Sequence, residues 1–333
     1  MDIFTMIDSQ PAQLRQDYFR AKSSDKAEGI TRVVVAGMGG SALGAEIVKE
    51  AFRDTLRVPL EISRGYSVSE MLDEHTLFIA SSYSGNTEET LVCLEQAIRL
   101  NTQIAVITSG GKLLEEADQR GFDIARLAPN VQPRLAVFAN LKALVEILDY
   151  YNLLEFSDID RELMDLANWL DVYKAQFSLD NTGDNQIKDL ASKLSGKIPM
   201  VYTSSNLQSA GYKWKIDINE NAKNLAFYNY YPELNHNEMN GWILPSSKDN
   251  LVVVQLVSGL DNGRNLKRMH LMPKLLEEYG FVHHTFKAPG QTYLQQLFMT
   301  ILAGDYLSAY LAELNHVDAV AVELVEKFKK KLL

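Results

Sequence analysis

The sequence has a single cysteine, Cys93, among its 333 residues. One thiol cannot form an internal disulfide or supply a cysteine-based metal cluster. Cys93 falls within a helical pattern, where a free cysteine ordinarily behaves as a small buried hydrophobic residue. We therefore expect Cys93 in the core. No spaced set of histidine, cysteine and acidic residues predicts a metal site.

The sequence also lacks a long apolar run. No stretch approaches the roughly 20 apolar residues that cross a bilayer. The N-terminal segment carries Asp2 and Asp8 and has no basic region followed by an apolar core, which is the pattern of a secretory signal. These features predict a cytoplasmic protein with no membrane partner.

Basic residues are fewer than acidic residues in this sequence. The 33 lysines and arginines stand against 43 aspartates and glutamates, so the formal net charge is −10. This balance argues against a nucleic-acid partner. Because it does not attract anions at long range either, any anion site must be made locally by dipoles and a few cations.

Strand and helix patterns alternate along the chain, which predicts parallel sheets flanked by helices. Residues 1–28 read as one or two amphipathic helices. Strands are expected at 31–36, 58–62, 76–81 and 103–108, with helices at 42–52, 87–100, 113–120 and 141–151. A second set has strands at 198–203, 251–257 and 282–288, with helices at 208–221, 264–279, 292–314 and 322–333.

The two sets predict two similar α/β halves without a strong sequence repeat. We expect domains at residues 1–153 and 196–333, joined by a polar helical connector at 154–195.

Two serine-rich turns follow apolar strands in the first half. They are Gly37-Met38-Gly39-Gly40-Ser41 and Ser82-Tyr83-Ser84-Gly85-Asn86-Thr87. A strand–turn–helix layout directs backbone N–H groups and hydroxyls at an anion. Plain capping of the next helix would explain Ser84 but not the whole cluster. The pattern favours a small phosphorylated ligand held by hydroxyl groups.

The first turn also fits a relaxed dinucleotide fingerprint. Gly37, Gly39 and Ala42 have the required spacing, and Glu61 in the next strand stands where a ribose-binding acid is expected. A dinucleotide fold gains nothing from a second hydroxyl cluster, whereas a phosphate needs several donors at one point. The sugar-phosphate interpretation is therefore favoured over the cofactor interpretation.

Polar segments in loops supply further candidates. In Asn219-Glu220-Asn221-Ala222-Lys223, an acid between two amides indicates either a polar helix end or a carboxylate oriented at a cleft. In Glu233-Leu234-Asn235-His236-Asn237-Glu238, the histidine is either a surface residue or one whose tautomer and pKa its neighbours set. Arg134, after Pro133, indicates a salt bridge or a fixed cation facing a crevice.

These segments together carry a family resemblance. In the order Gly37–Ser41, Ser82–Thr90, Pro133-Arg134, Asn219–Lys223 and Glu233–Glu238, they resemble the bifunctional phosphoglucose/phosphomannose isomerase family, which is built from two sugar isomerase (SIS) domains. The resemblance covers roughly residues 30–333. The Ser-x-Ser-Gly-Asn-Thr turn is typical of SIS domains in general, whereas the Asn-Glu-Asn-Ala-Lys and His-Asn-Glu segments are more specific.

The resemblance implies an α/β fold of two SIS-type domains, each a mostly parallel sheet flanked by helices. It implies an isomerase that interconverts glucose 6-phosphate and mannose 6-phosphate with fructose 6-phosphate through a cis-enediol, without a metal or other cofactor. It also implies a homodimer in which each site takes His236 from the other subunit.

The same resemblance implies roles for individual residues. The phosphate is bound by the hydroxyls of Ser41, Ser82, Ser84 and Thr87 and by backbone amides near Gly39 and Gly40. Glu220 transfers the proton, Arg134 steadies the enediolate charge, and His236 with Lys329 opens the sugar ring. The family's Asp-Pro-x-Pro stretch reads Asp318-Ala319-Val320-Ala321 here, which leaves Lys327 and Lys330 as alternatives to Lys329.

Two other functions stay open at this point. A non-catalytic SIS module would keep the serine turns to sense a sugar phosphate but would not need Glu220 and His236. A nicotinamide-dependent oxidoreductase is the more distant alternative.

Overall fold

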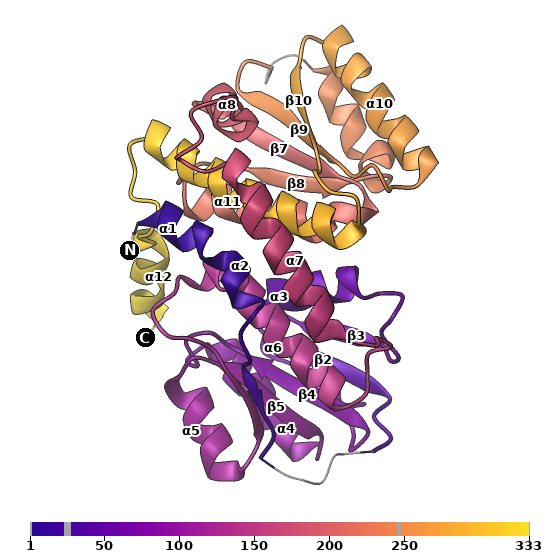
Figure 1. Cartoon of the computed structure of the whole chain (residues 1–333), viewed down its shortest axis with the longest axis vertical. Helices are drawn as coiled ribbons and strands as arrows, with labels where there is room; N and C mark the ends of the chain where they lie inside the picture. The colour runs from indigo at the N-terminus through magenta and orange to yellow at the C-terminus, as the bar shows by residue number, and fades with distance from the viewer. Residues whose placement is uncertain (1, 23–27, 245–247, 333) are drawn as a thin grey trace. The chain divides into compact units, whose positions relative to one another are not determined.

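The computed structural model describes residues 2–22, 28–244 and 248–332. The chain divides into two compact units (Figure 1). One is Ser9–Asn168, and the other combines Met1–Asp8 with Trp169–Leu333. The domain boundaries expected from the sequence, near residues 153 and 195, remain a prediction.

The Ser9–Asn168 unit contains a six-stranded sheet in the order β1-β6-β5-β4-β2-β3. The strands are β1 (Phe19–Arg20), β2 (Arg32–Ala36), β3 (Leu60–Ser63), β4 (Thr76–Ser81), β5 (Gln103–Thr108) and β6 (Asp123–Arg126). Only β1 runs antiparallel to its neighbour. The strands β2, β4 and β5 are apolar and buried on both faces, as parallel strands between two helix layers are.

Helices cover both faces of this sheet. Figure 1 shows α3 (Gly39–Ala51) and α6 (Val137–Tyr150) on one side, and α4 (Glu88–Arg99) and α5 (Gly111–Arg120) on the other. Alternate residues of each strand face opposite ways, so Val34, Phe78 and Val106 pack in the α4–α5 layer with Cys93 and Leu94. Cys93 is fully buried on α4, as predicted.

The N-terminal prediction was partly wrong. Two short helices, α1 (Ile3–Asp8) and α2 (Gln10–Gln13), are present as expected, but the helical structure stops there and the strand β1 follows. Residues 23–27 lie outside the described part of the chain. The strands β1 and β6 were not predicted. They are short and pair with each other, Phe19 opposite Ala125. Such a pairing leaves no local periodicity in the sequence.

The second unit has an all-parallel sheet in the order β10-β9-β7-β8. Its strands are β7 (Ile198–Thr203), β8 (Phe227–Tyr230), β9 (Leu251–Val257) and β10 (Val282–Lys287). This order repeats that of β5-β4-β2-β3 in the first unit, so the expectation of two similar α/β halves is confirmed. The edge strand β8 was not predicted because its four residues show no clear apolar alternation.

One face of this second sheet packs on α10 (Gly263–Glu278), with Tyr202, Trp242 and Met272 in the shared core. Helix α11 (Tyr293–Leu314) packs on α9 (Gln208–Glu220) and also contacts α8 (Gln186–Leu194) and α1. The predicted connector is helical, consisting of α7 (Ile159–Tyr173) and α8. The last helix is α12 (Glu323–Leu332).

Helix α11 is the central helix of the second unit. By length and composition it could cross a membrane, since an 18-residue window of the helix has a mean hydropathy of 1.2. However, 89% of this window is buried inside the structure. It is therefore a core helix. Its Gly304 lies under the indole of Trp214 on α9, and an added Cβ would come within 2.3 Å of the Trp214 Cδ1 atom.

We predict that Gly304→Ala lowers the free energy of unfolding by about 1–3 kcal/mol, because overpacking forces α9 and α11 apart. Intrinsic helix propensity works in the opposite direction, since alanine favours a helix interior over glycine. A urea titration followed by tryptophan fluorescence measures the change. Gly263→Ala, at the open start of α10, is the matched control and should be neutral or slightly stabilising. Equal stability of the two variants would contradict the close packing.

Candidate active site

The two serine-rich turns meet at one point of the first sheet. Strands β2 and β4 are parallel neighbours, with Ala36 opposite Ala80, so both turns leave the same edge. From β2 the chain moves to β3 on one side, whereas β4 and β5 lie on the other side. This reversal is the topological switch point where open α/β sheets bind ligands.

The hydroxyl groups of the turns are bonded to one another and to the backbone. Ser82 Oγ and Thr87 Oγ1 lie 2.7 Å apart, and Ser82 Oγ also accepts from the Gly85 N–H at 3.1 Å. The Tyr83 N–H donates to Ser41 Oγ at 3.1 Å, which joins the second turn to the first. Ser84 is exposed and accepts from the Asn86 N–H. We call Gly39, Gly40, Ser41, Ser82, Ser84 and Thr87 the hydroxyl cradle.

Gly40 brings the Arg134 segment against this cradle. A Cβ at Gly40 would lie 2.6 Å from the carbonyl oxygen of Pro133, so only glycine allows this approach. Pro133 begins η1 (Pro133–Leu135), a short 3-10 helix in which Arg134 is buried with 3% of its surface exposed. The Arg134 guanidinium donates to Gln132 Oε1 at 3.2 Å. The backbone of a buried arginine therefore lies against the cradle.

The contacts in the cradle argue against plain helix capping. Thr87 is the N-cap residue of α4, yet its side chain makes no capping hydrogen bond and pairs with Ser82 instead. Met38, the N-cap of α3, makes none either. The first-turn N–H groups of both helices are therefore not used by side-chain caps, which suits an anion at these helix ends.

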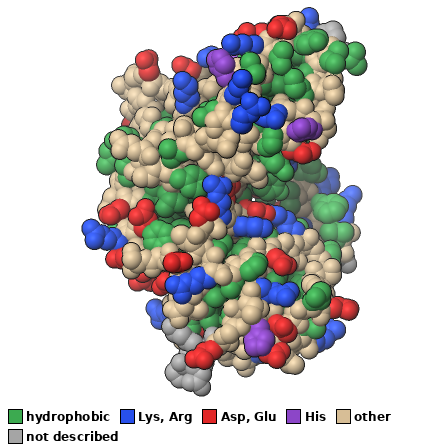
Figure 2. All heavy atoms as spheres, turned by 90° about the vertical axis from the view of Figure 1, so that its right-hand side faces the viewer, with side chains coloured by type: hydrophobic (Ala, Val, Ile, Leu, Met, Phe, Trp, Pro, Cys, Tyr) green, Lys and Arg blue, Asp and Glu red, His purple; other side chains and the backbone are tan. Residues whose placement is uncertain are grey.

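The position of Glu61 argues against the dinucleotide interpretation. Glu61 is exposed and lies within the edge strand β3, opposite Val34 and two residues before the end of the strand, instead of at the carboxyl end where a ribose would bind. On the face shown in Figure 2, acidic and basic side chains of the Ser9–Asn168 unit are interspersed, without a broad basic field. Binding of an anion here depends on the cradle itself.

In the second unit, Glu220 is the last residue of α9 and lines a pocket of about 570 Å³. The pocket wall combines the α9 end with the segment around Val317–Val325; its lining residues include Asn219, Lys223, Leu225, Val317, Ala321 and Leu324. Glu220 is half-buried. A carboxylate partly withdrawn from water at a pocket wall has the placement of a general base.

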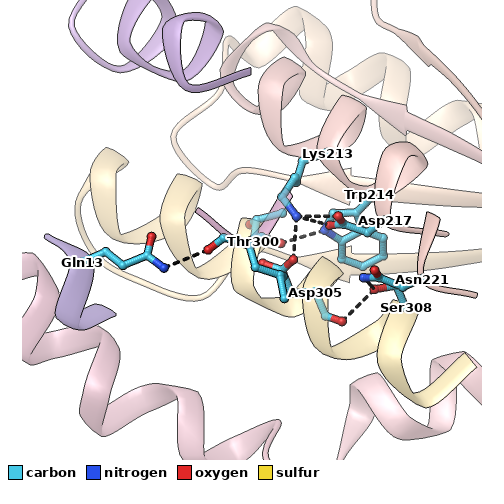
Figure 3. A network of polar contacts seen from close by, with 9 residues as sticks. Gln13, Lys213, Trp214, Asp217, Asn221, Thr300, Asp305 and Ser308 are labelled. Atoms are coloured by element: carbon cyan, nitrogen blue, oxygen red, sulfur yellow. Dashed lines mark hydrogen bonds and ion pairs between the residues drawn. The ribbon is translucent and has the colours of Figure 1, made fainter. Parts of the chain in front are cut away.

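The residues that flank Glu220 hold the helix end in place. Asn219 Nδ2 donates to the Asn224 carbonyl at 2.8 Å, and Asn221 Nδ2 donates to Ser308 Oγ on α11 at 2.8 Å (Figure 3). Lys223, three residues after the end of the helix, has the left-handed backbone conformation, with φ of 52°. Its ammonium donates to the carbonyls of Glu220, Asp318 and Ala321. Lys223 thus ties the C-terminal segment to α9, a role the sequence analysis missed.

His236 is exposed at the end of η4 (Glu233–His236), on a loop that is firmly anchored. Glu238, two residues later, accepts from the Tyr202 hydroxyl and from Asn229 Nδ2. Burial and the Glu238 carboxylate raise the pKa of Tyr202 far above its usual range, so this phenol stays a donor. Glu238 was part of a motif noted in the sequence, but its contact with Tyr202, 36 residues away, was not predicted.

Helix α12 carries Lys329 outside the Glu220 pocket. The Lys329 ammonium is exposed and pairs with Glu326 at 3.1 Å, and α12 has no buried residue. Only the start of α12 lines the pocket. Among the described residues, no group of three or more histidine, cysteine or acidic side chains is placed to hold a metal ion.

Comparison with known families agrees with this architecture. Residues 29–145 match the SIS domain, and residues 183–332 match the bacterial phospho-glucose isomerase C-terminal SIS domain. The two parallel α/β units, with a hydroxyl cradle at a switch point, therefore define a protein of two SIS domains. The C-terminal domain of glucosamine-fructose-6-phosphate aminotransferase from Francisella tularensis has the same fold, with a TM-score of 0.70 at 16% identity, over 96% of this chain and 98% of that chain.

Full-length relatives narrow the class. The chain is 34% identical to the bifunctional phosphoglucose/phosphomannose isomerase of Caldicellulosiruptor bescii, over 99% of this chain and 98% of the relative. It is 31% identical to the enzyme of the same name from Aquifex aeolicus, over 90% of each. The chain belongs to the bifunctional phosphoglucose/phosphomannose isomerase family.

We predict that Thr87→Val weakens binding of fructose 6-phosphate by about tenfold to a hundredfold, because a hydrogen bond to a charged group contributes roughly 1.5–3 kcal/mol. Thr87→Ser restores the hydroxyl and should recover most of the affinity. Isothermal titration calorimetry measures both dissociation constants. Thr55→Val is the control, since the Thr55 hydroxyl donates to the nearby Phe52 carbonyl in the same unit and has no part in the cradle. An unchanged dissociation constant for Thr87→Val would show that the phosphate binds elsewhere.

Proposed function

We infer that this protein is an aldose–ketose isomerase that interconverts glucose 6-phosphate and mannose 6-phosphate with fructose 6-phosphate. The observation that carries this inference is the half-buried Glu220 carboxylate on the wall of a pocket, in a chain whose other unit holds a hydroxyl cradle. The family relationship over the whole chain supports it.

The cradle is assigned to the phosphate of the substrate. Ser41, Ser82, Ser84 and Thr87 offer hydroxyls, and the turn at Gly39 and Gly40 offers backbone N–H groups at the start of α3. The phosphate remains bound throughout the reaction, so these groups stabilise the ground state and the transition state alike. Their loss should therefore act mainly on KM.

Glu220 is assigned to proton transfer. Its carboxylate takes the proton from C2 of the open-chain aldose, which leaves a cis-enediolate with the charge on O1. The O2 proton passes to O1 through the enediol, and the carboxylate returns its proton to C1 to form the ketose. Because C2 is planar in the enediol, glucose and mannose 6-phosphates share this intermediate, and one base serves both. Arg134 is assigned to the negative charge that develops on the enediolate oxygens.

Ring opening precedes proton transfer and is assigned to His236 and Lys329, as a proton donor and acceptor on O5 and O1 of the sugar. The exposure of His236 on an anchored loop suits a residue that completes the site of a second subunit. We propose a cytoplasmic homodimer in which each subunit lends His236 to the other. Lys329 is proposed with Lys327 and Lys330 as its alternatives on the same exposed helix.

A non-catalytic sugar-phosphate sensor would also need the cradle. It would have no use for a carboxylate on a pocket wall, and the curated relatives with near full-length matches are named as isomerases. The isomerase is therefore the better supported function.

The test of this function is Glu220→Gln, which keeps the shape of the side chain and removes the base. We expect kcat to fall by roughly 10²–10⁴-fold, the range for loss of a positioned general acid or base. Both isomerisations should fall in equal proportion, together with exchange of the substrate C2 proton with solvent. Coupled assays with each 6-phosphate and NMR in deuterated water measure these quantities.

Glu278→Gln is the matched control, since Glu278 is the last residue of α10 as Glu220 is of α9. It should retain nearly full turnover. Near-normal turnover of Glu220→Gln, or loss of one activity without the other, would rule out a single shared base at this position.

Sharing of His236 is tested by complementation. Protomers with Glu220→Gln and protomers with His236→Ala should each be inactive alone. Mixed dimers should regain activity, because one of their two sites then holds both intact groups. Absence of recovery, when native mass spectrometry shows that subunits have exchanged, would place His236 in the site of its own subunit.

A further inference from the structure

A fully buried cluster of charges lies one helical turn before Glu220 (Figure 3). The Lys213 ammonium on α9 contacts both carboxylate oxygens of Asp217 and one of Asp305 on α11, each at 2.5 Å. All three side chains have no exposed surface. None of them has a part in the reaction assigned above.

Stability does not account for this cluster. Removing ions from water costs several kcal/mol each, and replacing a buried ion pair by apolar residues is often neutral or stabilising. One ammonium also faces two carboxylates. Burial raises the pKa of Asp217 well above its usual range. Although burial alone lowers the pKa of Lys213, Asp217 and Asp305 raise it above its usual value.

What the cluster supplies is a defined register between two helices. Helix α11 is mostly apolar, and apolar surfaces by themselves pack in several registers. Lys213 to Asp305 is one directional contact across the helix pair. Trp214 Nε1 adds a second by donating to the Thr300 carbonyl at 2.7 Å. With the Asn221 contact to Ser308, polar contacts to α11 extend from Lys213 to the residue that follows the last turn of α9.

The register of α9 against α11 affects the position of Glu220, the last residue of α9. Asp217 and Glu220 are three residues apart, so they lie on adjoining turns of nearly the same helix face. A shift or rotation of α9 would move the Glu220 carboxylate by a similar amount. Misplacement by about 1 Å is enough to cost roughly 10²-fold in rate.

We propose that Lys213, Asp217 and Asp305 are positioning residues that hold α9 in register so that Glu220 is aligned for proton transfer. This proposal rests on the isomerase function inferred above. The cluster acts through the helix and does not touch the substrate. Its loss should therefore lower kcat and leave substrate binding in place.

The first test replaces the charges by apolar side chains, in Lys213→Met/Asp217→Val/Asp305→Val. We expect a folded protein whose melting temperature is not lower than that of the wild type. The kcat for fructose 6-phosphate should fall at least tenfold, and KM should change less than twofold. A folded triple variant with unchanged kcat, or one in which KM rises as kcat falls, would overturn the proposal.

The second test keeps the experiment decisive if the triple variant does not fold. Asp305→Asn retains an acceptor for the Lys213 ammonium, whereas Asp305→Val removes it. The asparagine variant should keep most of the wild-type kcat, and the valine variant should lose at least tenfold at similar KM. Equal kcat values in the two variants would overturn the cross-helix contact as the positioning element.

The Ser9–Asn168 unit offers a matched control. There Lys142 contacts Glu146 at 2.5 Å and Asp160 at 2.7 Å, again one lysine with two carboxylates. Lys142→Met/Asp160→Asn should leave kcat within twofold of the wild type, and an equal loss of kcat would overturn the proposal. An inactive wild-type protein would instead overturn the isomerase function itself, so the two failures are distinct.

Discussion

The parallel pairing of β2 with β4 is the constraint on which the candidate binding site depends. Adjacent parallel strands end at the same edge, so the turns after them must meet there. From these two strands the chain moves to opposite sides of the sheet, so this edge is a switch point of the kind at which open α/β sheets bind ligands. Small residues and hydroxyls from both turns lie there.

In the second unit, several polar contacts lie close to the end of the helix that carries Glu220. Lys213, Trp214 and Asn221 join this helix end to α11. Gly304 allows the Trp214 indole to lie directly on α11. The Lys223 ammonium donates to three backbone carbonyls and so joins the helix end to the C-terminal segment. Rigid support on both sides is what a positioned base requires.

Sequence reasoning succeeded where structure follows from local pattern. The strands 76–81 and 103–108 were predicted to the residue, because each is a short apolar run bounded by turn residues. The prediction was wrong where pairing is tertiary: β1 is defined by its pairing with β6, and β6 by its pairing with β1 and β5, and neither short strand has a clear pattern of its own. The contacts of Lys213 with Asp305 and of Glu238 with Tyr202 were not predicted either, since these partners lie 92 and 36 residues away in the sequence.

By itself, the sequence determined the α/β class, the order of most elements, and the presence of hydroxyls at strand ends and of an acid at a helix end. These depend on periodicity and turn chemistry, which act over a few residues. Only the tertiary structure decided that Thr87 pairs with Ser82 instead of capping its helix, that Pro133 rests on Gly40, and that Asp305 meets Lys213. Such contacts arise from how whole elements pack, and residue type alone does not specify which distant partner a polar group will find.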